Sequence, residues 1–599
     1  MNDTPESWSV ADTLKAARTR LLAERGTAGF WQGELSSSAL STAVAAFALH
    51  QVNPDANRET IKRALYWLVD QANPDGGWGD TPDSPSNLST TLLGWAALNL
   101  SKAHDHRTDR ARQNTEAWLI RTTGSLEPGV LAQAVMTSYG NDRTFSTPIL
   151  TLCALSGCLG DAPWKWVPQL PFEWCVLPHR LFRFARLEVV SYAIPALIAI
   201  GLLRHRRSPE RPRLLGWLRD AVTPRALRLL RRCQPAHGGF LDAAPLNGFV
   251  AASLAAAGLR DHPVTQDCAR FLIATIRSDG SWPIDTNLAT WLTALSVNAL
   301  ANGNETLSAL LNEEKVRLRN WLTEQQFDKT HPYTQAAPGG WGWTALPGAV
   351  PDADDTSGVL LALSQLGADL PEVQTAARKG IQWLLGLQNT DGGIPTFCRG
   401  WGRLPFDRSC PDITAHTLVA WDAWYAWMEP DLQRTLDAAL HTGIQYLTQN
   451  QQKDGSWLPL WFGNQFTATQ ANPTYGTAHV IRALNSLTPG RMPERGALVE
   501  KGTSWLLEAQ NADGGWGGAK NSPSSIEETA LALAALNPME SADAIQRGTI
   551  WLVQHTRGGT QFPPASIGLY FARLWYSERL YPIIFTVHAL AAIEKATPL

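Results

Sequence analysis

Three acids stand within four positions in Pro351–Gly358, which reads PDADDTSG: Asp352, Asp354 and Asp355. Ionised carboxylates this close repel one another, so the cluster holds a proton, binds a cation or benefits from its negative charge. One interpretation is that the acids only cap a helix that follows them. Another is a strong acid, because neighbouring carboxyls share the proton count and a helix N-terminus stabilises the carboxylate left after an alkene is protonated. A divalent-metal site is the weaker alternative, since no second acidic segment supplies further ligands.

A second pair of chemically active residues lies in PDITAHTLVAW, where Asp412 and His416 are four positions apart. This spacing places both side chains on one face of a helix. A cationic imidazole beside a carboxyl group favours the conjugate base of that acid, and a nearby carboxylate favours the charged imidazole. A lone His on an amphipathic helix also has a purely structural interpretation.

Tryptophan is the unusual feature of the composition, with 26 residues in a chain of 599. Aromatic faces stabilise a migrating cation without bonding to it, by up to about 2 kcal/mol per ring in a desolvated site. Carboxylates along the path would quench the cation, and water would trap it. Because the charge is transient, the aromatic stabilisation is catalytic. Core packing explains any single Trp equally well, so only the set indicates such a cavity.

The remaining composition argues against several classes of protein. A net charge of −3 and 18% charged residues argue against a nucleic-acid partner. Seven cysteines, with no C-x-x-C spacing, argue against a disulfide framework and favour a reducing compartment. We expect no signal peptide and no membrane-spanning helix, because no apolar run reaches about 20 residues.

Repetition dominates the organisation of the chain. One pattern recurs: an aromatic-Leu pair, a Gln a few residues later, then Asp-Gly and usually Trp. Such repeats indicate a supersecondary unit whose face is buried by its neighbours. We expect two helices per unit, with the first ending at the Gln, a turn at Asp-Gly and an apolar second helix such as 526–537. The clearest copies span Arg63–Gly79, Arg378–Gly393, Gly443–Trp457 and Glu500–Gly517.

These units predict an all-α fold, built either as closed rings of helix pairs or as an open solenoid. The repeats resemble the QW repeats of triterpene cyclases, and Asp352–Thr356 resembles the D-x-D-D-T motif of squalene-hopene cyclases. The likeness extends from Gly29 to the last helix. It implies two α/α (α6-α6-like) barrels around a large apolar cavity, with an inserted domain at 24–284 and a catalytic domain at 1–23 and 285–599.

The resemblance also implies roles for the acids. Asp354 is the expected proton donor, and Asp352 and Asp355 orient and support it. In the family an Asp-x-x-x-His pair lies beside the catalytic acid, which implies that His416 hydrogen-bonds Asp354 as a cation and that Asp412 keeps His416 charged. No cofactor and no metal ion are expected.

Six aromatic residues match positions that line the family's cavity. Trp343 occupies the place of a cation-stabilising Phe, Trp291 matches a Trp near the far region of the cavity, and Tyr475 matches a Tyr near the acids. The expected substrate-binding set is Trp343, Trp341, Trp291, Trp461, Tyr475 and Phe562. The Trp residues inside the repeats are expected to stiffen the shell instead: Trp78, Trp457 and Trp516.

Three departures from the family pattern bear on the product more than on initiation. Val350 stands where the family commonly has Tyr, and Val189 stands where it has Trp. The stretch after Phe562 is about one helical turn longer than the pattern. It offers further aromatic residues: Tyr570, Phe571, Trp575 and Tyr576.

The resemblance implies acid-initiated cyclisation of squalene to a hopane-type triterpene. It also implies a homodimer at the cytoplasmic face of a membrane, held there as a peripheral or monotopic protein. Two apolar segments are candidates for membrane contact: 189–203, and 245–259, which the family's substrate-channel helix favours.

Three alternatives remain for the function. The first is a class II cyclase that acts on a prenyl diphosphate or on an oxidised or longer polyprene. The second is a zinc-dependent protein prenyltransferase, for which Cys398 and Cys410 lack a matching His. The third is a non-enzymatic scaffold of helical repeats.

Overall fold

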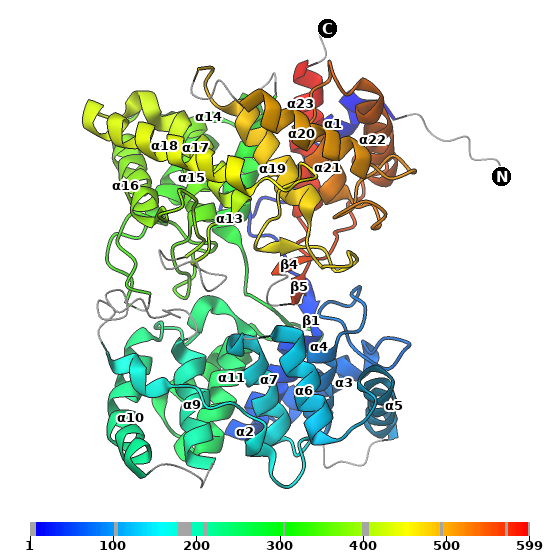
Figure 1. Cartoon of the computed structure of the whole chain (residues 1–599), viewed down its shortest axis with the longest axis vertical. Coiled ribbons are helices and arrows are strands. Elements are labelled where there is room, and N and C mark those ends of the chain that lie inside the picture. Colours follow the sequence, from blue (N-terminus) through cyan, green and yellow to red (C-terminus); the bar gives the residue numbers. More distant parts are fainter. Residues whose placement is uncertain are drawn as a thin grey trace, which may run out of the picture.

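The computed structural model confirms the all-α class. It describes residues 8–100, 106–140, 142–177, 194–207, 213–303, 306–332, 334–397, 407–490, 495–569 and 573–596. Figure 1 shows two groups of helices stacked along the long axis of the molecule, with short strands at their junction.

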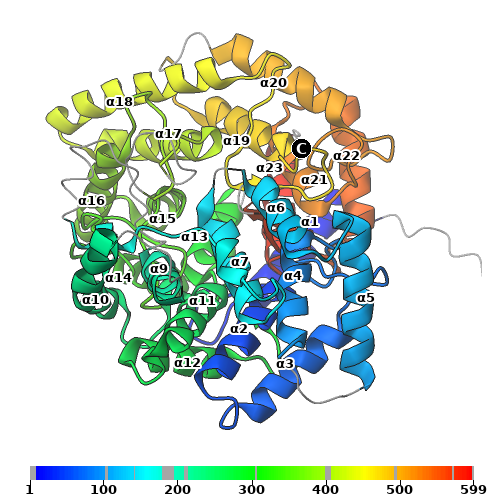
Figure 2. The same ribbon diagram turned by 60° about the horizontal axis from the view of Figure 1, so that its bottom comes forward.

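The lower group in Figure 1 comes from the first half of the chain. Contacts run from α2 to α4, from α4 to α7, from α7 to α9 and α11, and from α11 back to α2, which closes a ring. Figure 2 shows α3, α5, α10 and α12 outside this ring. The helices are α2 (Ala39–Val52), α3 (Arg58–Asp70), α4 (Leu88–Leu98), α5 (His106–Thr123), α6 (Pro128–Tyr139), α7 (Arg143–Leu155), α9 (Ile194–Arg207), α10 (Arg213–Cys233), α11 (Ala244–Leu254) and α12 (Pro263–Thr275).

The upper group contains the rest of the chain and the N-terminal helix. Its inner helices α13, α15, α17, α19, α21 and α23 contact one another in sequence, and α23 returns to α13. Closed rings therefore replace the open-solenoid alternative. Helix α1 (Val10–Ala23) packs on α22 and α23. The others are α13 (Ala289–Ala301), α14 (Asn312–Glu324), α15 (Ala353–Gly367), α16 (Pro371–Leu387), α17 (Pro411–Trp424), α18 (Pro430–Asn450), α19 (Pro473–Ser486), α20 (Arg495–Ala509), α21 (Ile526–Ala535), α22 (Ala542–His555) and α23 (Tyr581–Ala596).

The composition of each helix explains its layer. Helix α21 buries almost every residue, as an apolar helix enclosed by neighbours must, whereas α22 alternates buried and exposed residues at helical spacing. The same contrast separates α2 from α3. Apolar second helices therefore form the inner ring, and amphipathic first helices form the outer layer.

Three hydrogen bonds recur among the repeats. In the repeat around Trp516, the indole Nε1 donates to Leu506 O at 2.7 Å, and the Gln510 amide donates to Gly514 O at 2.8 Å and to Ala544 O at 2.9 Å in the next outer helix. The repeats of Trp31, Trp78, Trp282 and Trp457 also place an indole N–H on a Leu carbonyl ten residues earlier. The predicted structural role of Trp78, Trp457 and Trp516 is thus confirmed.

The Asp-Gly turn joins each repeat to the next. Asp513 accepts from Gly515 N at 3.0 Å within the turn and from Trp551 Nε1 at 3.0 Å in the next outer helix. The glycine of the turn has a left-handed conformation, and a Cβ on Gly455 would lie 2.5 Å from Lys501 O. Only glycine fits there, which explains the repeated Asp-Gly pair.

Short strands lie where the two groups meet. β1 (Ser37–Ser38) pairs antiparallel with β2 (Trp282–Pro283), which joins the two ends of the lower group. A second sheet has the order β3 (Phe462–Gly463), β4 (Ile567–Leu569), β5 (Leu574–Tyr576). Trp575 N donates to the buried Asp80 at 2.7 Å, which links this sheet to the lower group. The predicted domain bounds, 24–284 within 1–23 and 285–599, stay a prediction.

The two apolar segments considered for membrane contact lie inside the protein where they are described. Residues 245–259 form most of α11 and a π-helical turn (Ala255–Leu259), and nearly all of α11 is buried. The burial of α11 in an inner ring argues against membrane contact by residues 245–254, whereas Gly258 in the π-helical turn is exposed and membrane contact there stays a prediction. Residues 194–203 lie in the largely buried α9, and 189–193 lie outside the described residues. Nowhere in the described ranges is a helix long and apolar enough to cross a bilayer.

Candidate active site

The acid cluster begins helix α15. Asp352 is the N-cap residue, and its Oδ1 accepts from Asp355 N at 2.9 Å. Asp354 and Asp355 occupy the first turn, where the helix dipole stabilises negative charge. The capping interpretation therefore holds for Asp352, and it leaves the carboxyl of Asp354 available for another role.

Asp354 is paired with His416. Asp354 Oδ1 and His416 Nδ1 are 2.6 Å apart, a hydrogen-bonded distance, and the two side chains are 18% and 12% exposed. Helices α15 and α17, which carry them, are neighbours in the inner ring. Gly358, one turn further along α15, lets Trp291 approach this helix closely, since a Cβ there would lie 3.1 Å from the Trp291 ring. The expected contact between Asp354 and His416 is present.

Asp352 and Asp355 favour the protonated state as a pair. Burial raises the pKa of Asp352 to about 7, even though bonds from Asp355 favour its ionised form. Burial, followed by the charge of Asp352, raises the pKa of Asp355 well above its usual range. Burial and their mutual repulsion therefore favour a proton on this pair of carboxyls. The cluster therefore carries fewer negative charges than its three acids suggest.

Asp412 does not form the expected contact that would keep His416 charged. Its Oδ1 accepts from the Cys410 thiol at 2.7 Å, and within the described part of the chain Asp412 and His416 form no ion pair. Burial raises the pKa of Asp412 to about 7 despite the bond from Cys410, and the charge of Asp354 adds to the rise. The physical reason is position: Asp412 lies in the first turn of α17, and its carboxyl turns back to the N-cap residue Cys410.

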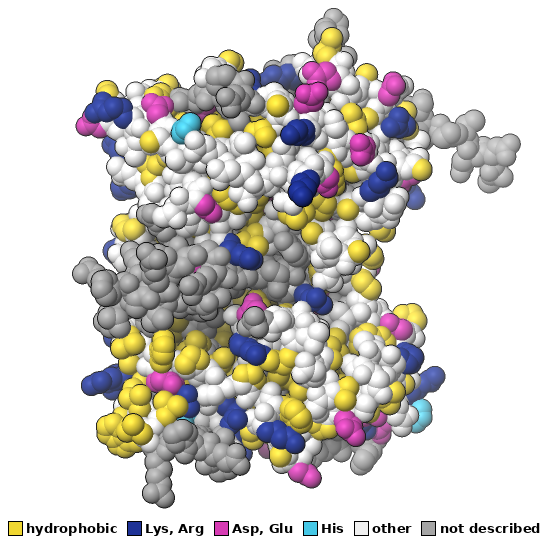
Figure 3. All heavy atoms as spheres, in the orientation of Figure 1, with side chains coloured by type: hydrophobic (Ala, Val, Ile, Leu, Met, Phe, Trp, Pro, Cys, Tyr) yellow, Lys and Arg dark blue, Asp and Glu magenta, His cyan; other side chains and the backbone are white. Residues whose placement is uncertain are grey.

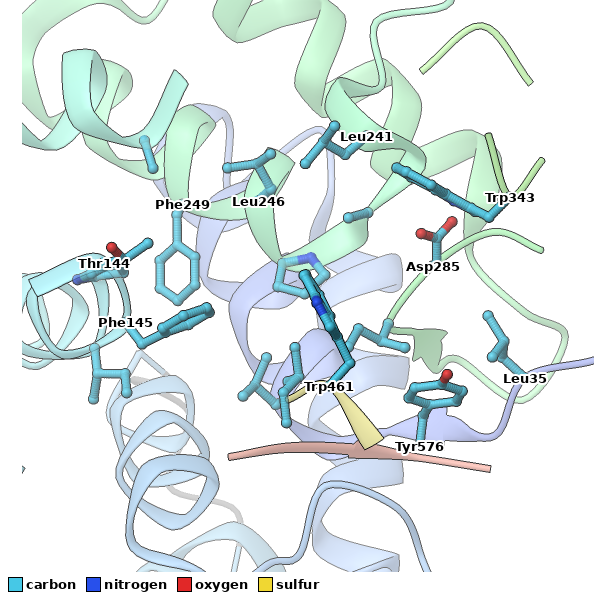
Figure 4. A pocket seen from close by; sticks show the side chains of 18 of the residues that line it. Leu35, Thr144, Phe145, Leu241, Leu246, Phe249, Asp285, Trp343, Trp461 and Tyr576 are labelled. Carbon is cyan, nitrogen blue, oxygen red and sulfur yellow. The ribbon is translucent and has the colours of Figure 1, made fainter. Parts of the chain in front are cut away.

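An apolar cavity of about 340 Å³ lies beside the acids. Its walls come from both groups of helices: α7, α9 and α11 below, and loops and β5 above. Seven described aromatic residues line it: Tyr139, Phe145, Phe249, Trp343, Phe397, Trp461 and Tyr576. Figure 4 shows several of these rings around the same space. None of the described lining residues is Lys or Arg.

One end of the cavity is tied directly to the acid cluster. Trp341 and Asp352 pair as an antiparallel bridge, with Asp352 N donating to Trp341 O at 3.0 Å. Two residues further along this pairing, Trp343 and Val350 both line the cavity. Asp352, Asp354 and Asp355 do not themselves belong to the described lining. This end of the cavity therefore lies two residues along the pairing from Asp352.

Trp343 and Trp461 are the predicted residues that line the cavity. The Trp343 and Phe397 rings meet edge to face at 6.3 Å, and Phe397 and Trp461 do so at 5.2 Å. Phe397 is an additional lining residue that sequence reasoning missed. Its signal was weak, because it follows an Asp-Gly turn whose repeat carries Ile394 in place of Trp.

Trp341 is not part of the cavity wall. It is fully buried, and its Nε1 donates to Leu322 O at 2.7 Å, as the repeat tryptophans do. The prediction that it binds substrate is therefore wrong. The sequence held the signal, because GGWG around Trp341 matches the DGGWG of the repeat that contains Trp516.

Trp291 and Tyr475 lie at the acid end, outside the described lining. The Trp291 ring meets His416 at 6.2 Å, and its Nε1 donates to Tyr581 Oη at 3.1 Å. Trp291 is thus beside the acids and not in the far region of the cavity, because helix α13 packs directly on α15. Tyr475 stacks on His479 at 4.3 Å, and burial and then the charge of Asp354 raise its pKa.

The C-terminal aromatic residues have separate places. Phe562 is half-buried in the loop after α22 and is not among the described lining residues, so its contact with substrate stays a prediction. Trp575 is buried, whereas Tyr576 lines the cavity. Several predicted positions lie outside the described residues: Val189, Cys398, Tyr570 and Phe571.

Asp285 is a lining residue that the sequence analysis did not consider. It follows β2, close to the repeat tryptophan Trp282, and its carboxyl faces the cavity (Figure 4).

No cluster of three or more metal-ligating side chains occurs among the residues that the structure describes.

Several known terpene cyclases are similar to this chain. Enfumafungin synthase from Hormonema carpetanum is 26% identical over 91% of this chain, but the chain spans only 45% of that protein. The squalene–hopene cyclase of Alicyclobacillus acidocaldarius is 24% identical, with 80% of this chain and 79% of that protein covered. Among solved structures, ent-copalyl diphosphate synthase from Streptomyces platensis shares the fold, with a TM-score of 0.56 at 20% identity over 98% of this chain and 99% of that one.

Family models cover most of the sequence. The squalene-hopene cyclase C-terminal domain matches residues 288–595, and the N-terminal domain of the same family matches residues 14–214. The first match spans more than half of the chain and contains the acid cluster, His416 and the upper wall of the cavity. The chain belongs to the squalene-hopene cyclase family of class II terpene cyclases.

Proposed function

We propose that this chain cyclises a linear isoprenoid hydrocarbon, with squalene as the first candidate, by protonating a terminal double bond with Asp354. The observation that carries the proposal is the 2.6 Å contact between Asp354 and His416 at the start of α15, beside an aromatic cavity. A helical scaffold without catalysis would not need a paired carboxyl next to such a space.

The first step transfers a proton from oxygen to carbon. The O–H bond of Asp354 breaks, the alkene π electrons form the new C–H bond, and the adjacent carbon becomes cationic. The carboxylate left behind is stabilised by the free N–H groups of the α15 N-terminus and by His416. A proton shared between Asp352 and Asp355 removes one negative charge that would oppose this step.

The following ring closures need an environment that stabilises charge without reacting. Each double bond attacks the preceding cation, which forms a C–C bond and moves the positive charge along the chain. The edge-to-face set Trp343, Phe397 and Trp461 offers π-electron density along one wall. A cascade that runs to full length on squalene gives a hopane-type triterpene.

The cavity wall favours a hydrocarbon substrate over a prenyl diphosphate. A diphosphate in a buried site requires cationic or hydrogen-bonding partners, and the described lining contains neither Lys nor Arg. The named relatives include both types, since one is a squalene–hopene cyclase and another a copalyl diphosphate synthase. Squalene is therefore the first substrate to test, and a prenyl diphosphate is the second.

The test is product analysis with the purified full chain in detergent. Squalene is expected to yield cyclic products with or without Mg²⁺, and Asp354→Asn is expected to yield none. Geranylgeranyl diphosphate serves as the competing substrate. Conversion of that diphosphate alone would overturn the hydrocarbon proposal, and full activity in Asp354→Asn would overturn the assignment of the acid.

An exposed apolar surface suits a protein that takes its substrate from lipid. We propose that it contacts a membrane surface. It consists of Trp174, Leu177, Leu214, Trp217 and Leu218, all 38–79% exposed. Figure 3 shows hydrophobic side chains gathered at the lower left, where α10 lies. The further turns of α10 present the exposed Arg225 and Arg228, which suit anionic headgroups.

Vesicle flotation tests this surface. The full chain is expected to float with vesicles that contain anionic phospholipid, and the double variant Leu214→Glu/Trp217→Glu is expected to remain in the soluble fraction. Ile550→Glu, on the outer helix α22, is the matched control, because Ile550 is an exposed apolar residue of the other group. Equal flotation of all three proteins would contradict the proposal. The predicted homodimer stays a prediction.

A further inference from the structure

Asp285 is the carboxyl group of the described cavity wall. It lies between β2 and α13, where its backbone bridges to Ala243 and its Oδ1 accepts from Thr286 N at 2.7 Å. Figure 4 shows it between Trp343 and Tyr576, at the end of the cavity that the pairing of Trp341 with Asp352 ties to the acids. The proton-donating cluster does not include it.

The cyclisation needs a base as well as an acid. Asp354 supplies one proton at the start, and a hydrocarbon product forms only when the last cation loses a proton from an adjacent carbon. The other described polar groups on the wall are the hydroxyls of Tyr139, Thr144 and Tyr576, and the indoles of Trp343 and Trp461. These groups are neutral and weak proton acceptors, whereas an ionised carboxylate is a strong one.

The surroundings of Asp285 act on its charge in both directions. Burial, followed by the charge of the nearby Asp242, raises its pKa well above the usual range, whereas the Thr286 N–H and the Trp343 indole favour its ionised form. The raised pKa itself favours the neutral acid, so these two hydrogen-bond donors are what supports the ionised form that acts as the base. Asp242 is itself held by His237 and by Gly348 N, which donates at 2.8 Å, so it is not the group that faces the cavity.

We propose that Asp285 is the base that ends the cyclisation, and that it does so early in the cascade. The carboxylate takes a proton from the carbon next to the cation. The electrons of that C–H bond form a C=C bond, and Asp285 becomes a neutral acid that returns its proton to solvent when the product leaves. Because Asp285 lies beside Trp343 at the acid end, the cation within its reach is one formed in the first rings.

This inference rests on the proposed function and makes it more specific. A carboxylate at the acid end deprotonates the carbocation before the positive charge has moved along the whole substrate. The wild-type product is therefore expected to be a partly cyclised alkene whose new double bond lies close to the protonated end. A full hopane-type skeleton is expected only when this base is removed.

The test compares Asp285→Asn with the wild type, using squalene and total product analysis. The amide keeps the oxygen that accepts from Thr286 N but removes the base. Since a general base contributes about 10²–10⁴-fold to proton abstraction, the share of the wild-type alkene among all products is expected to fall at least about tenfold. Products with more rings, or alcohols from water capture, are expected to replace it.

Three further variants make the outcome decisive. Asp285→Glu keeps a carboxylate and is expected to retain alkene products. Asp80→Asn is the matched control, because Asp80 is a buried acid that accepts from Asn87 and Trp575 N and is not among the described lining residues of the cavity. Its product ratio is expected to equal that of the wild type. Asp354→Asn is expected to consume no substrate.

The two proposals fail in different ways. Asp285→Asn that consumes squalene and gives the wild-type product ratio would overturn the role of Asp285 and leave the acid untouched. A wild type that yields mainly a hopane-type pentacycle would overturn the early position of the base. Unchanged consumption in Asp354→Asn would instead overturn the proposed function, and the role of Asp285 with it.

Discussion

The contact between Asp354 and His416 gives a prediction whose size follows from its geometry. In His416→Gln the imidazole whose Nδ1 lies 2.6 Å from Asp354 Oδ1 is replaced by an amide. A hydrogen bond that involves a charged group contributes about 1.5–3 kcal/mol, and both side chains are at most 18% exposed, so solvent screens the pair little. The carboxylate formed in the first step loses this stabilisation.

A loss of that size corresponds to a factor of about 10–150 in rate, because 1.36 kcal/mol is tenfold. The assay is the initial rate of squalene consumption in detergent micelles, measured by gas chromatography together with the product ratio. Only the first step uses His416, so the ratio of products is expected to stay constant while the total rate falls.

His588→Gln is the matched control for this variant. His588 is also enclosed within the inner ring, where burial lowers its pKa to about 3, and its ring nitrogen lies 3.3 Å from the Asn302 amide instead of an acid. Its rate is expected to stay within about threefold of the wild type. A His416→Gln rate within the same limit, with an unchanged melting temperature, would refute the reasoning. A changed product ratio would show that His416 acts on later cations.

Three further predictions concern the wall, the fold and the pH dependence. Trp343→Ala is expected to lower the rate about 2–30-fold, because about 0.5–2 kcal/mol of cation stabilisation is lost. Trp341→Ala is expected to lower the free energy of unfolding by about 3–5 kcal/mol, because Trp341 is a buried packing residue. Product analysis and thermal melting distinguish the two variants, and equal effects of the two variants on rate and on stability would contradict the assignment. Gly455→Ala is expected to lower the melting temperature because a Cβ meets Lys501 O at 2.5 Å, whereas Gly386→Ala, in open space on α16, is expected to leave it equal or raised. Burial raises the pKa of Asp412 to about 7, so the folded state binds this proton more tightly than the unfolded state and loses stability as pH rises from about 4 to 7. Urea unfolding at pH 5 and pH 8 measures this loss of stability, which is expected to be smaller in Asp412→Asn than in the wild type. An equal loss in the two proteins would show that Asp412 is ionised throughout.

The sequence predicted the repeats well, because each repeat depends on local signals. The Gln, the Asp-Gly turn and the Trp act within one unit or on the next outer helix, as the bonds of Gln510, Asp513 and Trp516 show. The acid cluster was also recognisable, since an N-cap and its first turn are contiguous in sequence. These features are local, and local chemistry determines them.

The cavity wall was predicted less well, because it depends on which face of an irregular segment turns inward. Trp341 and Trp343 are two residues apart, yet one is buried behind Leu322 and the other lines the cavity. Asp412 and His416 share a helix face, but the carboxyl of Asp412 accepts a hydrogen bond from the thiol of Cys410 instead. Spacing along the chain does not encode these competing partners.

Isotope incorporation tests the central claim most directly. When the wild type cyclises squalene in D₂O, each product molecule is expected to gain one deuterium at the carbon of the terminal double bond that Asp354 protonates, and Asp354→Asn is expected to form no such product. Cyclic products without deuterium, or deuterated products at an undiminished rate from Asp354→Asn, would contradict proton delivery by this carboxyl.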